Sequence, residues 1–312
     1  MRITGQLIDA LTGMHLWADH FDGSLEDVFE LQDKVASSVA GIIEPTLRTA
    51  EIRRSVQWPT HDLTAYDFYL RALPNRAAYD EHHTVRGLDL LGQAIERDPR
   101  YGPALVLAAE CHHFLVSNGW SDNQGIHRRE GIYLARQAVR FADDDPGALA
   151  KAALVLGFFG ENIDAAIALM DRSLALNPSF AEGWYNSGVL RNFAGKPDLA
   201  ISHLETSLRL NPRDRKARHL TRIGVAHFLS RRFDDAVASL VVSLEEIPSW
   251  TVTYRALTAC YAHMGRLDEA REIVSRLREI TPVVIPSVIP YRNPEHRELF
   301  LSGLRLAAGE TA

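Results

Sequence analysis

The sequence predicts a mainly α-helical protein in which pairs of helices repeat along the chain, and the spacing of two residue types carries this prediction. Four prolines lie 34, 36 and 34 residues apart: Pro178, Pro212, Pro248 and Pro282. Four alanines keep the same steps: Ala166, Ala200, Ala236 and Ala270. A period of this length is typical of helix–turn–helix units that stack side by side into a solenoid.

Within one period, the residues resemble the tetratricopeptide repeat. Its aromatic, small and proline positions are filled by Trp184, Gly188, Ala200, Ser207 and Pro212. Small residues let the two helices of a unit approach closely, and the proline ends the second helix. The resemblance implies a curved α-solenoid in which the first helix of each pair lines a concave groove. We also expect Trp184 to belong to the core.

Weaker matches extend the repeats toward the amino terminus and give about six helix pairs over residues 63–284. The first two units are expected at 63–100 and 102–145. Residues 285–312 contain Pro286 and Pro290 and then Asn293-Pro294, which is typical of a helix start. This helix is predicted to cap the last repeat, because a repeat array must cover its exposed end.

Residues 1–57 do not follow the period. Two alternating segments, 3–9 and 15–21, predict a β-hairpin whose turn contains Gly13, a residue suited to positive φ. Ser24 then predicts the beginning of a long helix with apolar residues at helical spacing. The region is therefore a hairpin followed by a helix.

This region resembles the carboxyl-terminal part of the TolB-amino-terminal-like α/β domain. The resemblance is carried by Gln6-Leu7-Ile8-Asp9, Thr12-Gly13, Leu16-Trp17-Ala18 and Leu31-Gln32-Asp33. In a bacterial family this domain precedes tetratricopeptide repeats, often behind a class III adenylate/guanylate cyclase domain or a winged-helix DNA-binding domain. The resemblance implies that residues 1–57 are an incomplete α/β domain. We expect either the tail of a longer architecture or a Met1 that is an internal start.

Composition narrows the possible environments. The 312 residues are 46% hydrophobic and carry a net charge of −6, as expected for a globular protein of about two units. The apolar run 152–159 is far shorter than the roughly 18 residues of a membrane span. The sequence has no run of basic residues, which argues against nucleic acid as the principal partner. The amino terminus lacks a secretory pattern, and Cys111 and Cys260 lie far apart. We expect a cytoplasmic monomer or weak dimer with both thiols in the core.

The sequence shows no pattern typical of catalysis or of metal or cofactor binding. Asp9 and Asp19 fall on the single hairpin, without the further strands that hold the metal-binding aspartates of a class III cyclase. Cys111-His112-His113 are adjacent on a predicted helix, so their side chains point in different directions. Glycine-rich phosphate loops and GxSxG elbows are absent. We expect no enzymatic activity, no cofactor and no metal site.

The predicted concave groove supplies the candidate binding residues, which are polar, cationic or aromatic. They are Lys151, Tyr185, Asn186, Asn192, Arg218, Arg222 and Arg255. Amides of this kind hold a peptide backbone and cations hold carboxylates. Lys151, Asn186, Arg218 and Arg222 occupy positions similar to the carboxylate clamp of chaperone-binding repeats, although Val155 replaces an asparagine of that clamp. An ordinary solvated helix surface is the alternative interpretation.

These features predict a non-catalytic scaffold that binds a protein or peptide in the concave groove, with a carboxylate of the partner as a candidate contact. The first alternative is a regulatory region of a class III adenylate/guanylate cyclase. The second is the sensory or oligomerisation region of a winged-helix transcriptional regulator. Both alternatives rest on the family resemblance, and both place the catalytic or DNA-binding domain outside this chain.

Overall fold

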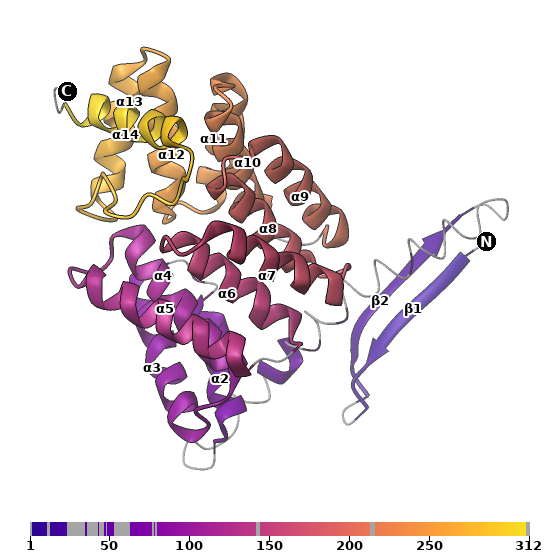
Figure 1. The fold of residues 1–312 in the computed structure, drawn as a ribbon. Coiled ribbons are helices and arrows are strands. Elements are labelled where there is room, and N and C mark those ends of the chain that lie inside the picture. The colour runs from indigo at the N-terminus through magenta and orange to yellow at the C-terminus, as the bar shows by residue number, and fades with distance from the viewer. Residues whose placement is uncertain are drawn as a thin grey trace.

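A computed structural model of the chain confirms the mainly α-helical fold with an amino-terminal hairpin (Figure 1). The structure describes residues 2–10, 13–23, 35, 43, 47, 49–52, 63–76, 78, 80–141, 144–212 and 216–309. Most of the long helix expected after Ser24 lies outside the described residues. Within the described part of the chain, no helix is both long and apolar enough to cross a bilayer.

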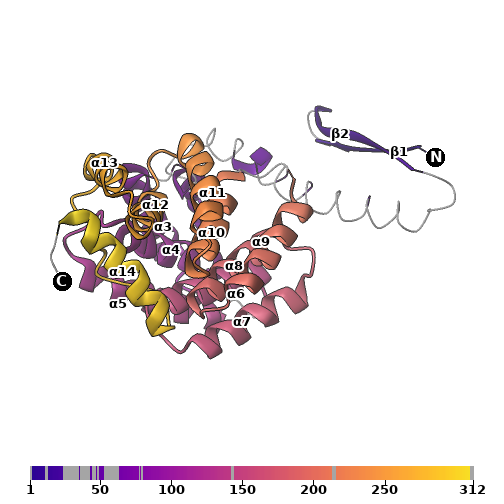
Figure 2. The same ribbon diagram turned by 90° about the horizontal axis from the view of Figure 1, so that it is seen from above.

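The hairpin consists of strands β1 (Arg2–Ile8) and β2 (His15–Asp22), which pair antiparallel with Leu7 opposite Trp17. Gly13 has a φ of 71°, as its predicted place in the turn requires. Trp17 is buried across Gly5, where a Cβ atom would lie 2.9 Å from the indole ring. Figures 1 and 2 both show the hairpin apart from the helical body.

The described helices from residue 65 onward form six consecutive pairs and one final helix. They are α2 (Ala65–Arg76), α3 (Glu81–Arg97), α4 (Gly102–Asn118), α5 (Gln124–Phe141), α6 (Pro146–Phe158), α7 (Ile163–Leu176), α8 (Ala181–Phe193), α9 (Pro197–Leu210), α10 (Lys216–Leu229), α11 (Phe233–Glu246), α12 (Thr251–His263), α13 (Leu267–Arg278) and α14 (Pro294–Ala308). The first helix of each pair packs on its own partner and, from α4 onward, also on the preceding pair, which is the arrangement of a solenoid.

Two small residues explain why the helices of a pair lie so close together. A Cβ atom on Gly188 would lie 2.6 Å from Cγ of Leu204, and one on Gly224 would lie 2.7 Å from Cγ of Leu240. Both glycines are on the first helix of a pair, and both leucines are on the second helix. Gly224 and Leu240 each lie 36 residues after Gly188 and Leu204, which is one repeat further along the chain. The glycine position of the repeat is therefore a contact position between helices.

A buried serine locks the second helix of three pairs to the first. Ser173, Ser207 and Ser243 each donate their hydroxyl to a backbone carbonyl at the start of the preceding helix, at 2.6, 2.8 and 2.7 Å. The carbonyls of a first turn already accept helical bonds, and a carbonyl oxygen has a second lone pair for the serine. This bond gives the repeated small residue a polar role in addition to close packing.

The solenoid curves until its second pair meets its last. The side chain of Thr251, at the start of α12, donates to Oδ1 of Asn118, at the end of α4, at 2.7 Å. Trp250 is buried in the same cluster as Leu115 of α4. Nearly all of α4 is buried, because neighbouring helices cover it on one side and α12 meets its carboxyl-terminal end. The concave groove is therefore narrow.

The chain ends in an irregular segment and α14. The predicted helix start is confirmed, since Oδ1 of Asn293 accepts from the Glu295 amide at 2.9 Å and Pro294 is the first helical residue. Helix α14 packs mainly on α12 and also reaches α10 and α13 (Figure 2). A Cβ atom on Gly303 would lie 2.9 Å from Cα of Ala259, so the two helices nearly touch through their backbones.

Two further expectations concern the core. Cys111 and Cys260 are buried free thiols, and burial raises the pKa of Cys260 to about 12. Trp184 meets this expectation in part, because its side chain packs against the main core cluster but is only partly buried. Its indole N–H donates to the carbonyl of Pro178 at 2.8 Å, so the ring lies over the end of the previous unit. A polar N–H near solvent explains why the ring stays at the rim.

Candidate functional site

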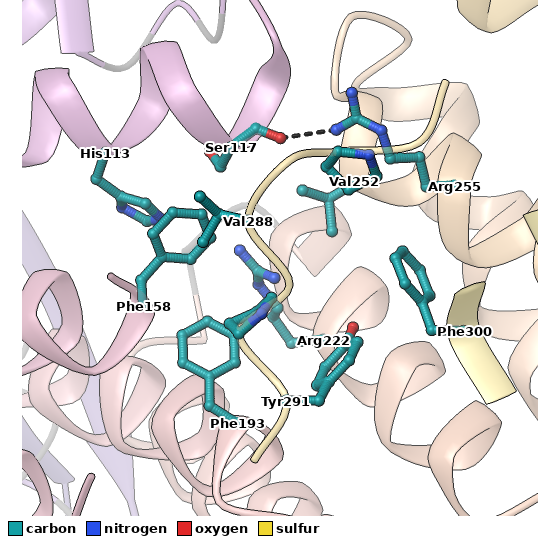
Figure 3. Close-up of a pocket in the computed structure, with 12 residues that line it drawn as sticks. His113, Ser117, Phe158, Phe193, Arg222, Val252, Arg255, Val288, Tyr291 and Phe300 are labelled. Carbon is teal, nitrogen blue, oxygen red and sulfur yellow. Dashed lines mark hydrogen bonds between the residues drawn. The ribbon is translucent and has the colours of Figure 1, made fainter. Parts of the chain in front are cut away.

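The inner groove of the solenoid is occupied by the chain itself. Residues 281–292, here called the carboxyl-terminal segment, run between α13 and α14 and lie against α4, α6, α8 and α12 (Figure 3). Val284, Ile289 and Tyr291 of this segment are buried. The segment forms no helix, as its prolines predict.

Arg255 on α12 holds the beginning of the segment. Its guanidinium donates to the carbonyls of Val283 and Val284 at 2.8 and 3.1 Å. It also donates to the carbonyls of Ser117 and Asn118 on α4, at 2.7 and 3.2 Å. The side chain is only 2% exposed, and burial lowers the pKa of Arg255 to about 10, which leaves it protonated at neutral pH. Arg255 therefore joins three parts of the chain.

The far end of the segment is held by Arg292. Its backbone amide donates to the carbonyl of Phe193 at 2.8 Å, and its guanidinium donates to the carbonyl of Gly157. Tyr291 packs edge-on against Phe193 and Phe300, with ring centroids 6.5 and 5.4 Å away. Both ends of the segment are thus fixed to first helices of the repeats.

A cavity of about 50 Å³ remains between the segment and the helices (Figure 3). Arg222 of α10 lines it, together with aromatic side chains such as Phe158 and Phe193 and with Val288 of the segment. Cζ of Arg222 lies 4.9 Å from the ring centroid of Trp250, and its Nε atom is buried without a hydrogen-bond acceptor. Among the described residues, no carboxylate oxygen lies within 4 Å of this guanidinium.

A second cavity, of about 370 Å³, opens at the amino-terminal ends of four first helices, α2, α4, α6 and α8. Tyr66, Tyr69 and Tyr101 form an aromatic wall, in which Tyr69 stands edge-on to Tyr101 at 5.6 Å between centroids. Lys151 and Glu182 line the same cavity. We call it the Lys151 cavity.

The charges around the Lys151 cavity are unequally paired. Glu182 forms an ion pair of 2.8 Å with Arg218, whose guanidinium also stacks 4.1 Å from the ring centroid of Tyr185. Asp145 caps α6 by accepting from the backbone amide of Gly147 at 2.8 Å. Within the described ranges, no carboxylate lies within 4 Å of the Lys151 ammonium group.

The structure divides the predicted groove residues between several environments instead of one binding surface. Lys151 lines the large cavity and Arg222 the small one. Tyr185, Asn186 and Asn192 are buried, Arg218 is paired with Glu182, and Arg255 is bonded to backbone carbonyls. The physical reason is the tight curvature, which turns the inner helix faces toward the carboxyl-terminal segment and toward one another. The tyrosines near Lys151 were not among the predicted residues, although their clustering near helix starts is visible in the sequence.

A histidine pair lies outside both cavities. The Nδ1 atoms of His112 on α4 and His127 on α5 are 2.8 Å apart, and Nε2 of His127 is 3.0 Å from the hydroxyl of Ser121. One ring must donate and the other accept, so protonating both removes the bond. Burial, with a smaller effect of His127, lowers the pKa of His112 to about 4. No group of three metal-binding side chains forms among the described residues.

This pair predicts a loss of stability in mild acid. His112 has an ordinary pKa near 6.5 in the unfolded chain, which therefore binds more protons than the folded chain between about pH 6.5 and 4. The stabilisation that the neutral, buried His112 provides is fully present above pH 6.5. Between pH 6.5 and 5, about 2 kcal/mol of the free energy of unfolding is lost. Urea unfolding of the wild type and of His112→Gln at both pH values measures the effect. Equal losses in the two proteins would contradict it.

The sequence of the repeats matches a known family over part of its length. Residues 193–249, from the end of α8 to the turn before α12, match the tetratricopeptide repeat model. The fold is a tetratricopeptide-like solenoid. The match supports the predicted repeat type over residues 193–249, which include two of the four periodic prolines, Pro212 and Pro248.

Solved structures share this fold at low sequence identity. The APC/C hetero-tetramer Cut9–Hcn1 aligns with a TM-score of 0.54 and 17% identity, over 89% of this chain and 49% of that chain. The human IFIT1 dimer with m7Gppp-AAAA aligns with a TM-score of 0.59 and 18% identity, over 71% of this chain and 52% of that chain. Identities this low show the similarity of fold alone.

One curated relative is a longer protein. "Putative adenylate cyclase 3" of Rhizobium meliloti (strain 1021) is 26% identical over 158 residues. The match covers 51% of this chain and 27% of the relative. The matched region is thus about a quarter of that protein.

Proposed function

We propose that the chain is a non-catalytic protein–protein interaction scaffold that holds a partner peptide in the Lys151 cavity. The observation that carries the proposal is the origin of this cavity, because first helices from four successive repeats contribute to its wall. A surface shared by several repeats is the usual way in which a solenoid recognises an extended ligand. The volume of about 370 Å³ falls within the size range of ligand pockets.

The chemistry of the wall indicates which part of a peptide fits. Tyrosine rings supply apolar contact area with a polar tip, as in many protein interfaces. Lys151 supplies a cation, while Glu182 is already paired with Arg218 and Asp145 with backbone amides. A carboxylate beside an apolar side chain complements this arrangement, and a free acidic carboxyl terminus carries both. Monomer or weak dimer formation and a cytoplasmic location stay predictions.

A selection from random octapeptides with free carboxyl termini tests the proposal. The wild-type chain should enrich peptides that end in acidic residues, and Lys151→Gln should lower their affinity about tenfold, because it removes the charge and keeps the length of the side chain. Lys196→Gln is the matched control, since Lys196 is exposed at the start of α9 and does not line the cavity. Fluorescence anisotropy of enriched peptides gives the affinities. Enrichment that is identical on wild type and Lys151→Gln would contradict the proposal.

A second candidate function rests on the curated relative. We propose, as the alternative, that the chain regulates the catalytic domain of a class III adenylate cyclase. It is supported by the 26% identity to a protein named as a putative adenylate cyclase and by the resemblance of residues 1–57 to the TolB-amino-terminal-like domain of a family whose members often carry a cyclase domain. Adding the purified chain to the catalytic domain of the Rhizobium protein should then change the rate of cyclic AMP formation. An unchanged rate would count against this alternative.

A further inference from the structure

The small cavity under the carboxyl-terminal segment has an unusual charge balance. Arg222 and Arg255 both line it, and no aspartate or glutamate does. The covering segment, residues 281–292, contains no acidic residue and ends in the cation Arg292. The guanidinium of Arg255 is engaged in four donor bonds to backbone carbonyls, so Arg222 is the cation whose donors are left to bind an anion.

Arg222 is partly buried, and the hydrogen-bonding capacity of its guanidinium is incompletely used. Its Nε atom is buried without an acceptor, and its stacking on Trp250 compensates only part of the lost hydration. The cavity gives the guanidinium an apolar surrounding made of Phe158, Phe193 and Val288 (Figure 3). The charge also reaches Tyr291, where Arg222 opposes the rise in pKa that burial causes. A planar anion is the natural complement of such a guanidinium.

The cavity size restricts that anion. A volume of about 50 Å³ offers room for roughly three to five non-hydrogen atoms, at about 10–15 Å³ for each water-sized position. Acetate has four such atoms and propionate five. The carboxyl-terminal segment covers the cavity and is fixed at both ends by Arg255 and Arg292, which favours a small free acid over the end of a polypeptide.

We propose that this cavity binds a short-chain monocarboxylate of the size of acetate or propionate. The carboxylate pairs with the guanidinium of Arg222, and the methyl or ethyl group lies among the aromatic side chains and Val288. This site is independent of the proposed function, because it uses a different cavity, different residues and a different class of ligand.

Calorimetric titration of the full chain with propionate, at ionic strength matched by sodium chloride, tests this site. Saturable binding is expected for propionate, with at least tenfold weaker binding of propionamide, which has the same shape without the charge, and of hexanoate, which is too long. Arg222→Met should weaken propionate binding at least tenfold while keeping the packing of the alkyl chain. Arg209→Met is the matched control, because Arg209 is exposed on α9 and does not line the cavity, and it should bind as the wild type does.

A second variant protects the test against misfolding. Val288→Trp fills the cavity from the covering segment without touching any charge, and it should also abolish binding. The site is overturned if propionate produces no more heat than sodium chloride, or if both Arg222→Met and Val288→Trp bind propionate like the wild type. It is also overturned if an acidic octapeptide displaces propionate and its amide does not, because the cavity would then belong to a partner chain.

Discussion

Replacing Arg255 by methionine is expected to lower the free energy of unfolding by about 3–5 kcal/mol, the largest single-residue effect that we predict. The guanidinium is almost fully buried and satisfies carbonyls of Ser117, Asn118, Val283 and Val284. Methionine fills a similar volume but leaves these carbonyls without their donors. Because the carbonyls belong to α4 and to the carboxyl-terminal segment, the loss should also loosen the contact between the second and the last helix pairs.

Chemical denaturation monitored by circular dichroism measures this effect. Arg255→Lys keeps the charge but lacks the planar fork of donors, so it should recover only a small part of the loss. Arg271→Met is the matched control, because Arg271 is exposed on α13 and its one ion pair among the described residues is with Asp268; its cost should stay below about 0.5 kcal/mol. A cost of less than 1 kcal/mol for Arg255→Met would show that the bond network does not brace the fold.

Replacing Gly303 by valine should detach α14, with a cost of about 3 kcal/mol. A Cβ atom at this position would lie 2.9 Å from both Cα and Cβ of Ala259 and 3.1 Å from its carbonyl oxygen. Backbone atoms of α12 cannot move aside as the end of a flexible side chain does. The helix must therefore shift as a whole, which exposes Leu304 and Phe300.

Gly92→Val provides the matched comparison for this variant. Gly92 is exposed on α3, and its missing side chain would meet no atom within 4 Å. The same substitution should change stability by only a few tenths of a kcal/mol there, since glycine and valine both form helices less well than alanine. Thermal denaturation of the two variants, with trypsin susceptibility of α14 as a second readout, separates them. Equal melting temperatures would contradict the close backbone contact.

The sequence predicts the repeats well because their determinants lie inside each pair of helices. Gly188 meets Leu204, and Ser207 bonds to the carbonyl of Ala181, over separations of 16 and 26 residues. The serine bond recurs in three pairs and the glycine contact in two, so these contacts leave a period in the sequence. The start of α14 was predictable for the same local reason, since Asn293 and Pro294 act on the first turn alone.

The candidate site was less predictable because its determinants are not local. The carbonyl of Ser117 that Arg255 binds lies 138 residues earlier in the chain, and the amide of Arg292 reaches back to Phe193. No periodic pattern records these contacts. Standard repeat geometry places Lys151, Arg222 and Arg255 in one open groove, whereas the curvature of this solenoid and its carboxyl-terminal segment separate them. The curvature depends on many small packing differences that single positions do not show.

Occupation of the groove by residues 281–292 can be measured by amide hydrogen exchange of this segment, using mass spectrometry with fragmentation to single residues. We predict that the Arg292 amide, bonded to the carbonyl of Phe193, exchanges about a hundredfold more slowly than in an unstructured peptide of the same sequence. We also predict that Arg255→Met reduces this protection. Exchange of the Arg292 amide at the rate of the free peptide would show that the segment leaves the groove open.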